Sequence, residues 1–271
     1  ITAEHLPGLR ITNPRQSGLD FSGDPGDFHL AIEAQRIRLG HTQDPHFAVN
    51  ASSITPLPHQ LEAVYRYMLT APLVRLLLAD DPGAGKTIMA GLLLKELRFR
   101  GLASRVLIVV PPLVCRQWQE ELHNRFAEDI QVIDSGLRDA NPGRNPFLEH
   151  DRCVTSLYWA MREENLALLR EAKWDLVIID EAHKMAAYEE GKRNPKTSKT
   201  KLYHLGEELT VRTNHLLLLT ATPHKGDPEN FRLLLELLDK DLFADRKILD
   251  EAVKRGNEQL RRFEQTNKSA K

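Results

Sequence analysis

Apolar residues gather in short blocks along most of the chain. Six runs are apolar at nearly every position, at 74–79, 105–110, 130–134, 152–156, 175–179 and 215–219. Runs of this length without polar alternation are typical of strands that are covered on both faces of a parallel sheet. We therefore expect six strands of one sheet.

The segments between these runs carry apolar residues at helical spacing. In the segment 113–126, Val114, Trp118, Leu122 and Phe126 recur every four residues and so share one helix face. Helices are expected at 27–39, 59–69, 86–100, 113–126, 158–171, 199–212 and 227–238. Strands that alternate with helices predict an α/β fold with a doubly wound, mostly parallel sheet and helices on both faces.

Both ends of the chain depart from this alternation. Residues 1–26 are rich in Pro and Gly, which interrupt regular structure, so residues 1–54 are expected to form an arm with one helix, which Asp27 could cap. Residues 241–271 are charged and mixed, and a helical extension is expected there. The alternating strands and helices of the α/β domain are then expected over residues 55–240.

Composition narrows the class of protein. The 271 residues carry 37 Lys and Arg against 38 Asp and Glu, a net charge of -1, so any nucleic-acid surface must be local. Cys115 and Cys153 each lie in an apolar segment, as is typical of buried thiols in a reducing compartment. No apolar run approaches the roughly 18 residues of a membrane span. We expect a cytoplasmic protein with no membrane partner, and the start at Ile1 suggests a piece of a longer chain.

A Gly-rich turn between the first strand and the helix at 86–100 carries the strongest chemical signal. Residues 76–87 read LLLADDPGAGKT. Gly83 and Gly85 allow backbone angles at which several N–H groups point into one concavity. The N-terminus of the following helix also favours an anion, so this turn predicts a site for nucleotide phosphates.

The two residues that close the turn fit the same chemistry. Lys86 would reach the β- and γ-phosphates, and the Thr87 hydroxyl would hold a magnesium ion. The full phosphate-loop spacing asks for glycine at position 80, where this chain has Asp80, so the match is partial. The alternative is an ordinary strand-to-helix turn with a surface lysine.

A second signal follows the strand at 175–179. Asp180 and Glu181 come directly after it, at the carboxyl edge of the sheet, where open α/β folds bind ligands. Asp180 can hold magnesium, and Glu181 can accept a proton from a water that attacks the γ-phosphate. A solvated acidic turn is the alternative.

A third signal lies at the end of the strand at 215–219. The hydroxyls of Thr220 and Thr222 can hydrogen-bond the catalytic carboxylates and report on the state of the nucleotide. Alone this pattern is weak, because strand ends often carry threonine and proline.

The order of these segments resembles the first motor lobe of superfamily 2 helicases and translocases, and the details look like the Snf2 family. The phosphate loop of that family begins with aspartate and an acidic residue, which accounts for Asp80 and Asp81, whereas Pro82 and Ala84 replace its usual larger apolar residues. The resemblance implies a RecA-like lobe over 55–240. Within the family the likeness is closer to bacterial and archaeal members, such as an RNA-polymerase-recycling translocase and the helicase component of DISARM-type phage defence.

The resemblance also implies roles for single residues. Leu57-Pro-His-Gln60 is similar to the adenine-recognising glutamine motif, and Asp180-Glu-Ala-His183 matches the acidic motif, the DEAH box. Nucleotide binding is expected at Gln60, Asp81, Gly83, Ala84, Gly85, Lys86 and Thr87. Catalysis is expected from Lys86, Asp180 and Glu181, Mg²⁺ binding from Thr87 and Asp180, and coupling from His183, Thr220 and Thr222.

Two further segments are candidates for DNA contact. Residues 109–121, VVPPLVCRQWQEE, look like the family motif that touches a DNA strand, which points to Pro111 and Pro112. Residues 184–201 hold six basic and two acidic side chains, a local charge of +4. This stretch is either a solvated loop or an insertion in which Lys192, Arg193 and Lys196 contact phosphates. Trp118 is a core residue or a stacking platform.

These observations predict an enzyme, the ATP-binding lobe of an ATP-dependent double-stranded DNA translocase or remodeller that uses ATP and Mg²⁺. The residues after Thr222 are too few for the second RecA-like lobe of such a motor, which supplies arginines, so this fragment is expected to hydrolyse ATP poorly alone. The alternatives are a nucleotide switch or scaffold without hydrolysis, and a strand-separating helicase or restriction-type motor. Defence-system or polymerase proteins are candidate partners.

Overall fold

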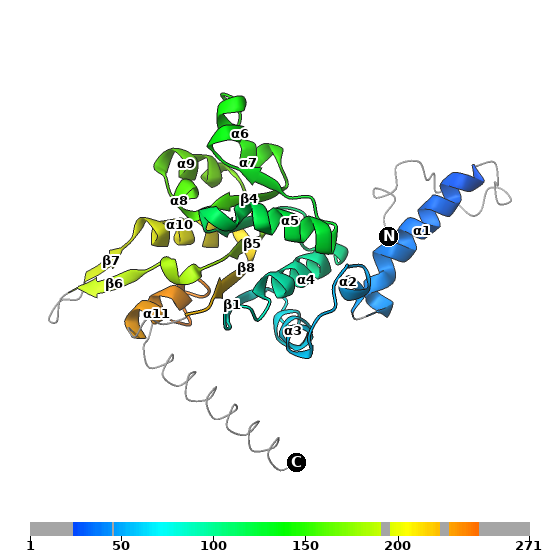
Figure 1. The fold of residues 1–271 in the computed structure, drawn as a ribbon, viewed down its shortest axis with the longest axis horizontal. Helices are drawn as coiled ribbons and strands as arrows, with labels where there is room; N and C mark the ends of the chain where they lie inside the picture. Colours follow the sequence, from blue (N-terminus) through cyan, green and yellow to red (C-terminus); the bar gives the residue numbers. More distant parts are fainter. Residues whose placement is uncertain (1–23, 45, 191–195, 223–227, 244–271) are drawn as a thin grey trace, which may run out of the picture. The chain divides into compact units, whose positions relative to one another are not determined.

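The six apolar runs form one parallel sheet, with strand order β1-β8-β5-β2-β4-β3 (Figure 1). The computed structural model describes residues 24–44, 46–190, 196–222 and 228–243. The strands are β1(Arg75–Ala79), β2(Val106–Val110), β3(Gln131–Ile133), β4(Arg152–Ser156), β5(Trp174–Ile179) and β8(Thr213–Thr220). Every neighbouring pair runs parallel, so the predicted sheet is confirmed.

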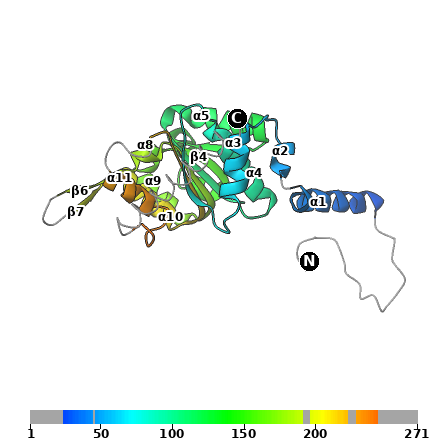
Figure 2. The same cartoon turned by 90° about the horizontal axis from the view of Figure 1, so that it is seen from below.

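Helices cover both faces of this sheet (Figure 2). One face packs against α2(Phe47–Asn50), the π-helix η2(Glu62–Met68), α4(Lys86–Phe99) and α5(Cys115–Phe126). The other packs against α7(Pro146–Glu149), α8(Leu157–Ala160), α9(Glu163–Glu171), α10(Lys201–Thr210) and α11(Pro228–Glu236). Within β2, Ile108 belongs to the first core and Leu107 to the second, and both are fully buried. This burial explains why the strands are apolar at consecutive positions.

Several predicted helices are divided or preceded by short turns. The helix predicted at 59–69 is α3(Pro58–Leu61) followed by the π-helix, and the one at 113–126 begins as a 3₁₀ turn, η3(Pro112–Val114). The helix predicted at 158–171 is α8 and α9. Among the described residues, three helices were not predicted: α2, α6(Ser135–Ala140) and α7. The side chains of Asp134 and Asn145 cap α6 and α7.

A two-stranded antiparallel sheet follows β5 and the turn η4(Ala182–Lys184). It pairs β6(Ala187–Glu190) with β7(Lys196–Lys199), so the basic stretch expected as a loop or insertion begins and ends as a hairpin. Lys192 and Arg193 lie outside the described residues.

The chain divides into two compact units, residues 1–45 and 46–271. In the first unit the structure describes one helix, α1(Pro25–Gln43), which begins before the predicted cap Asp27. Asp24 caps it instead, because its Oδ1 accepts the Gly26 N–H at 2.7 Å and Pro25 suits the first helical position. Of the extension predicted over 241–271, residues 244–271 lie outside the described residues, and the division at 54 and 240 stays a prediction.

Helices α4 and α5 pack in close contact. A Cβ added to Gly91 of α4 would lie 2.3 Å from Cε2 of Phe126 in α5. Phe126 is fully buried and cannot move aside into solvent. The absence of a side chain at position 91 therefore allows α5 to approach α4 this closely.

A buried carboxylate ties α4 to the rest of this face. The Glu128 side chain is fully buried and forms ion pairs with Lys95, Arg98 and Arg152. Lys95 and Arg98 belong to α4, and Arg152 opens β4. One carboxylate in the loop after α5 thus joins a helix and a strand that are far apart in sequence.

Candidate nucleotide-binding site

The carboxyl ends of β1, β8 and β5 lie side by side at one edge of the sheet. Ala79 pairs with Thr220, and Ile179 pairs with Leu218, so the residues that follow these strands are neighbours. A cavity of about 530 Å³ opens there. Seven of the predicted nucleotide, metal and catalytic residues line it: Gln60, Gly83, Gly85, Lys86, Thr87, Asp180 and Glu181.

The loop between β1 and α4 has the backbone angles that were expected from its two glycines. Gly83 and Gly85 have φ angles of 87° and 85°, in the left-handed region that favours glycine. Gly85 immediately precedes α4, whose first N–H groups have no partner within the helix. The N–H groups of Asp81 and Ala84 bond within the loop, to Asp80 Oδ1 at 2.9 Å and to Asp81 O at 3.2 Å. The amides at the start of α4 therefore remain available for the predicted anion.

Lys86 lies along the same loop. Its Nζ donates to the carbonyl oxygens of Asp80 at 2.8 Å and Asp81 at 3.1 Å. Phosphate oxygens carry more negative charge than these carbonyls and would compete for the same ammonium group. The lysine is thus held over the turn in which a phosphate would sit.

Gln60 connects the helix α3 to this loop. Its Nε2 donates to Ala84 O at 2.9 Å, and its Oε1 accepts the Leu57 N–H at 3.0 Å. A Cβ on Gly85 would lie 2.3 Å from Gln60 Nε2, so the side chain rests directly on the loop. His59 Nε2 lies 3.2 Å from the same Ala84 carbonyl. Gln60 therefore contacts the backbone of the phosphate loop as well as lining the cavity.

Asp180 is held by one donor on each oxygen. The Glu181 N–H donates to Oδ1 at 2.9 Å, and the indole Nε1–H of Trp118 donates to Oδ2 at 3.3 Å. Burial raises the pKa of Asp180 above its usual value, while these two hydrogen bonds and the charge of Lys86 lower it. Trp118 is 3% exposed, which confirms its place in the core, and it also reaches the site.

Glu181 begins a second set of contacts. Its φ of 52° is in the left-handed region, which is strained for a residue with a side chain. His183 Nδ1 lies 3.1 Å from Glu181 Oε2 and 2.9 Å from Thr220 Oγ1. The Thr222 N–H donates to the same hydroxyl at 3.1 Å. His183 thus lies between the hydroxyl of Thr220, a predicted coupling residue, and the carboxylate of Glu181.

These residues fit ATP and a magnesium ion. Mg²⁺ prefers oxygen ligands and is usually held by one or two protein groups together with phosphates and water. The Thr87 hydroxyl and the Asp180 carboxylate supply such oxygens on the wall of the cavity that also holds Lys86. Among the described residues, no group of three or more His, Cys, Asp and Glu could hold a metal ion.

One wall of the cavity was not predicted from the sequence. Gln117, Glu121 and Arg125 line it from α5, where the Gln117 Nε2 donates to Glu121 Oε1 at 2.9 Å. Their spacing of four places them on one helix face, beside the apolar stripe that was recognised. That polar stripe was the signal from which they could have been found.

The candidate DNA-contacting segment also ends a strand at this edge. Pro111 and Pro112 follow β2, and the next residue, Leu113, is 96% exposed. Val110 of β2 pairs with Ser156 of β4, so the residues after β4 are close by. Lys196, another predicted contact, opens β7.

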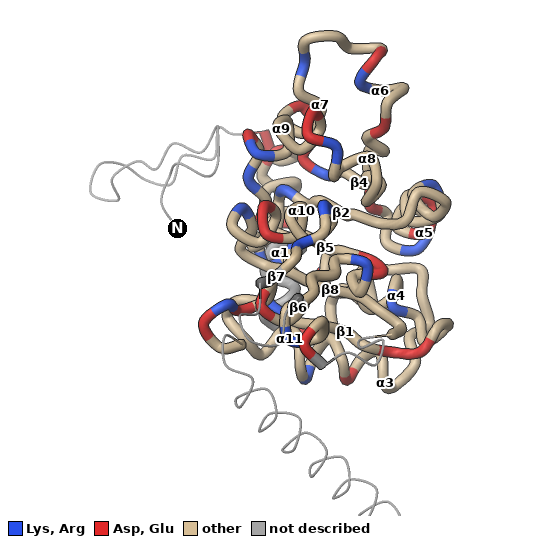
Figure 3. The backbone as a smooth tube through the Cα atoms, turned by 90° about the vertical axis from the view of Figure 1, so that its left-hand side faces the viewer, with Lys and Arg blue, Asp and Glu red and all other residues tan. Residues whose placement is uncertain are grey.

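An additional pair on the surface was not predicted. Tyr158 is 43% exposed, and the Nζ of Lys184 lies 6.0 Å from its ring centroid. Acidic and basic residues are interspersed along the described elements (Figure 3), so an interface with phosphates would depend on such local groups.

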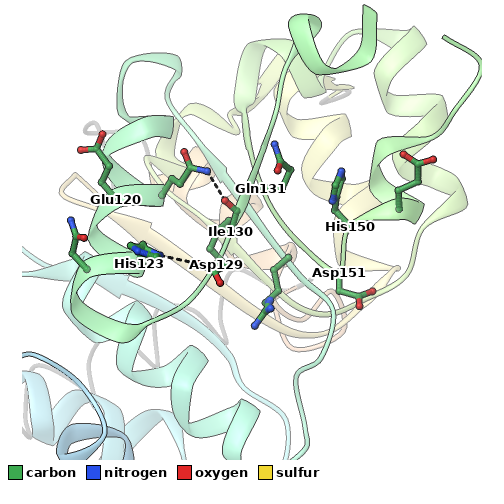
Figure 4. A pocket seen from close by; sticks show the side chains of 11 residues that line it. Glu120, His123, Asp129, Ile130, Gln131, His150 and Asp151 are labelled. Carbon is green, nitrogen blue, oxygen red and sulfur yellow. Dashed lines mark hydrogen bonds and ion pairs between the residues drawn. The ribbon is translucent and has the colours of Figure 1, made fainter. Parts of the chain in front are cut away.

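A second cavity, of about 600 Å³, opens at the opposite edge (Figure 4). It is lined by residues near the amino ends of β3 and β4, including Gln131 and Asp151, and by His123 from α5. His123 Nδ1 lies 2.8 Å from Asp129 Oδ1. None of the residues predicted for nucleotide, metal or DNA lines it. In the described part of the chain, no helix has the length and apolar character needed to cross a membrane.

The chain has similar sequences among known proteins. Residues 59–271 match the model of the SNF2-related domain. The chain is 34% identical over 225 residues to the RNA polymerase-associated protein RapA of Yersinia pestis (strain Pestoides F) and to that of Yersinia pseudotuberculosis serotype O:1b. These alignments cover 80% of this chain and 22% of each relative, so the chain spans about a fifth of their length.

A solved structure has a similar fold. It is the Sulfolobus solfataricus SWI2/SNF2 ATPase core in complex with double-stranded DNA, with a TM-score of 0.57 and 22% identity over 71% of this chain and 37% of that chain. A likeness at this identity shows the fold alone. Together with the parallel sheet, it confirms the expected RecA-like fold.

Proposed function

The chain belongs to the SNF2-related family of ATP-dependent motors, and we propose that it is the ATP-binding first lobe of a double-stranded DNA translocase or remodeller. One observation carries the proposal: residues from α3, the β1–α4 loop and the end of β5 line a single cavity at the carboxyl edge. Lysine for phosphates and carboxylates for metal and water are the two halves of a phosphoryl-transfer site.

Each residue has a role in this proposal. Lys86 binds the β- and γ-phosphates, Thr87 and Asp180 hold Mg²⁺, and Gln60 contacts adenine. Bound Mg²⁺ neutralises charge on the phosphates. Glu181 accepts a proton from the water that attacks the γ-phosphorus, as the bond from that phosphorus to the β,γ-bridging oxygen breaks. His183 links Glu181 to Thr220, which provides a path by which nucleotide state reaches the end of β8.

DNA would bind farther along the same edge. The segments after β2 and β4 are adjacent and present Pro111, Pro112 and Tyr158, and the Nζ of Lys184, in the turn after β5, lies 6.0 Å from the Tyr158 ring. The solved relative from Sulfolobus is described in complex with double-stranded DNA, which supports this choice of substrate. By the name of the Yersinia relatives, RNA polymerase is a candidate protein partner.

Hydrolysis is proposed to need residues from a second lobe. An arginine supplied to the transferred phosphate is worth about 10³- to 10⁵-fold in rate. The 271-residue chain alone is therefore expected to bind ATP and to turn it over slowly. Strong stimulation of ATP hydrolysis by DNA in this isolated chain would contradict that part of the proposal.

The test is steady-state ATP hydrolysis by the full-length protein, with and without duplex DNA. We expect duplex DNA to stimulate hydrolysis, and Glu181→Gln to abolish hydrolysis while ATP still binds. Glu163→Gln, the same chemical change on a side chain of α9 that is 77% exposed, should leave the rate unchanged.

Two results would decide against the proposal. ATP binding without hydrolysis in the wild-type protein would favour a nucleotide switch or scaffold, and the absence of ATP binding would overturn the site itself. Displacement of one strand from a duplex during hydrolysis would instead identify a strand-separating helicase.

A further inference from the structure

The indole of Trp118 is aimed at a residue of the proposed metal site. Its Nε1 lies 3.3 Å from Asp180 Oδ2, while the other oxygen of that carboxylate accepts the Glu181 N–H at 2.9 Å. A carboxylate with a fixed donor on each oxygen loses much of its freedom to rotate. The two bonds together select one orientation of the group.

Helix packing holds the indole in this position. Trp118 is 3% exposed, and Leu122 and Phe126, on the same face of α5, are fully buried. Phe126 in turn packs against the bare backbone of Gly91. The ring cannot swing away from Asp180 without moving the helix, so the hydrogen bond is imposed by the fold.

The other two tryptophans show that burial alone does not produce such a bond. The indole N–H groups of Trp159 and Trp174 are buried and have no hydrogen-bond partner among the described residues. Both rings lie on the opposite face of the sheet, in the core that contains Phe147. Trp118 therefore differs from them in what its N–H contacts and not in how deeply its ring is buried.

From this geometry we infer that Trp118 is a positioning residue that orients the Asp180 carboxylate toward a divalent cation shared with Thr87. The inference rests on the proposed function, because it needs Asp180 to hold the metal. Partners of metal-ligating carboxylates commonly change metal affinity by about 10- to 100-fold when they are removed. The rather long bond here places the expected effect near 10-fold.

The test measures nucleotide binding and not turnover. In the full-length protein, the anisotropy of a fluorescent ATP analogue is titrated with Mg²⁺ and, separately, in EDTA. For Trp118→Phe, which keeps a ring and loses the N–H, we expect unchanged binding in EDTA. The Mg²⁺ concentration that gives half of the metal-dependent gain in affinity should rise about 10-fold.

Trp159→Phe is the matched control, because it removes a buried indole N–H that has no partner and lies away from the site. It should titrate as the wild-type protein does. Should Trp118→Phe fail to fold, replacement of Trp118 by benzothienylalanine, which substitutes sulfur for the N–H in a ring of nearly the same shape, asks the same question.

The outcomes separate the two claims. A Mg²⁺ midpoint in the N–H-deficient variants equal to that of the wild type overturns the role of Trp118 and leaves the proposed function standing. Equal weakening in EDTA and in Mg²⁺ also overturns it, because that result indicates general damage to the pocket. A wild-type protein that binds no nucleotide overturns the proposed function and this inference with it.

Discussion

At the scale of single residues, Gln60 serves two neighbours at once. Its amide nitrogen donates to the Ala84 carbonyl of the phosphate loop, and its amide oxygen accepts the Leu57 N–H. The side chain is 6% exposed, so water cannot easily replace a lost partner. The conformation of the loop and the position of α3 are therefore linked through one amide group.

Gln60→Glu should weaken ATP binding by about 10-fold, because it keeps the acceptor for Leu57 and places a carboxylate against the Ala84 carbonyl. Dissociation constants from an ATP titration measure this change. His59→Ala is the control, since the exposed His59 lies 3.2 Å from the same carbonyl, and it should change affinity by less than about twofold. Wild-type affinity in Gln60→Glu would show that the donor is dispensable.

A buried histidine gives the fold a pH dependence. His215 is 4% exposed, and its Nδ1 accepts the Val74 N–H at 3.0 Å. Burial lowers the pKa of His215 below its usual 6.5, and the charge of Arg75 adds to this, while Asp175 opposes it. The folded protein therefore holds this imidazole neutral more strongly than the unfolded chain does.

The sign of the effect follows from the lowered pKa. His215 contributes its full stability above about pH 6.5, and that contribution is lost as the pH falls toward the folded-state pKa. His215→Asn can still accept from Val74 and does not titrate. The free energy of unfolding of this variant, from urea denaturation at several pH values, should fall less steeply below pH 6.5 than that of the wild type. Parallel curves would contradict this account.

At the scale of elements, the contact between α4 and α5 depends on Gly91. Alanine favours helices over glycine by about 1 kcal/mol, but its Cβ would lie 2.3 Å from a buried ring atom of Phe126. Overpacking of this kind costs about 1–3 kcal/mol. We expect Gly91→Ala to lower the free energy of unfolding by about 1 kcal/mol net.

The double variant Gly91→Ala with Phe126→Leu provides the control. A smaller side chain at position 126 relieves the contact, so the two changes together should cost less than the sum of their separate effects in urea denaturation. Simple additivity would show that the two helices do not meet through this pair.

The elements that could be predicted from the sequence have a common physical origin. Strands such as β2 are buried on both faces, which leaves an unbroken apolar run, and the phosphate loop needs glycine at fixed positions. The hairpin β6–β7 lacks both signals, because its residues 187–190 and 196–199 are mostly polar or charged and pair only with each other in the described sheet. The two strands pair through their backbones, which does not require an apolar pattern in the sequence.

The site was predictable in the same uneven way. Residues of the loop and of the end of β5 could be named, because strand ends at one edge of a parallel sheet must meet. The contact of Trp118 with Asp180 could not, because it depends on how α5 packs against the end of β5. The spacing of Trp118 with Leu122 and Phe126 indicates burial and does not reveal the polar atom at the edge of the ring.

At the scale of the whole molecule, the sheet order separates two kinds of surface. The nucleotide residues follow β1, β8 and β5, whereas Pro111, Pro112 and Tyr158 follow β2 and β4 on the other side of β5. Lys184 follows β5, but its Nζ lies 6.0 Å from the Tyr158 ring and it does not line the nucleotide cavity, so it belongs with this second group. Changes to the second group should therefore leave nucleotide binding in the absence of DNA intact. This separation gives a direct test of the DNA surface.

Lys184→Ala should weaken duplex binding at all sequences and lower the slope of log affinity against log salt by about 1, as expected for one lost phosphate contact. ATP affinity without DNA should stay as in the wild type. Lys173→Ala is the matched control, because Lys173 is exposed and precedes β5 at the opposite edge. Fluorescence anisotropy of labelled duplex over a range of salt gives both slopes, and an unchanged slope in Lys184→Ala would exclude Lys184 as a contact.

The ion pairs around Glu128 have a consequence for how related sequences can diverge. One fully buried carboxylate faces three cations, from positions 95, 98 and 152. Loss of the acid alone would remove the charge that these three cations share, and the cost would be largest at Lys95, whose side chain is only 11% exposed. A lineage that replaces position 128 with a neutral residue should also have lost basic residues at two or more of the other positions. These four columns of an alignment are therefore expected to change together.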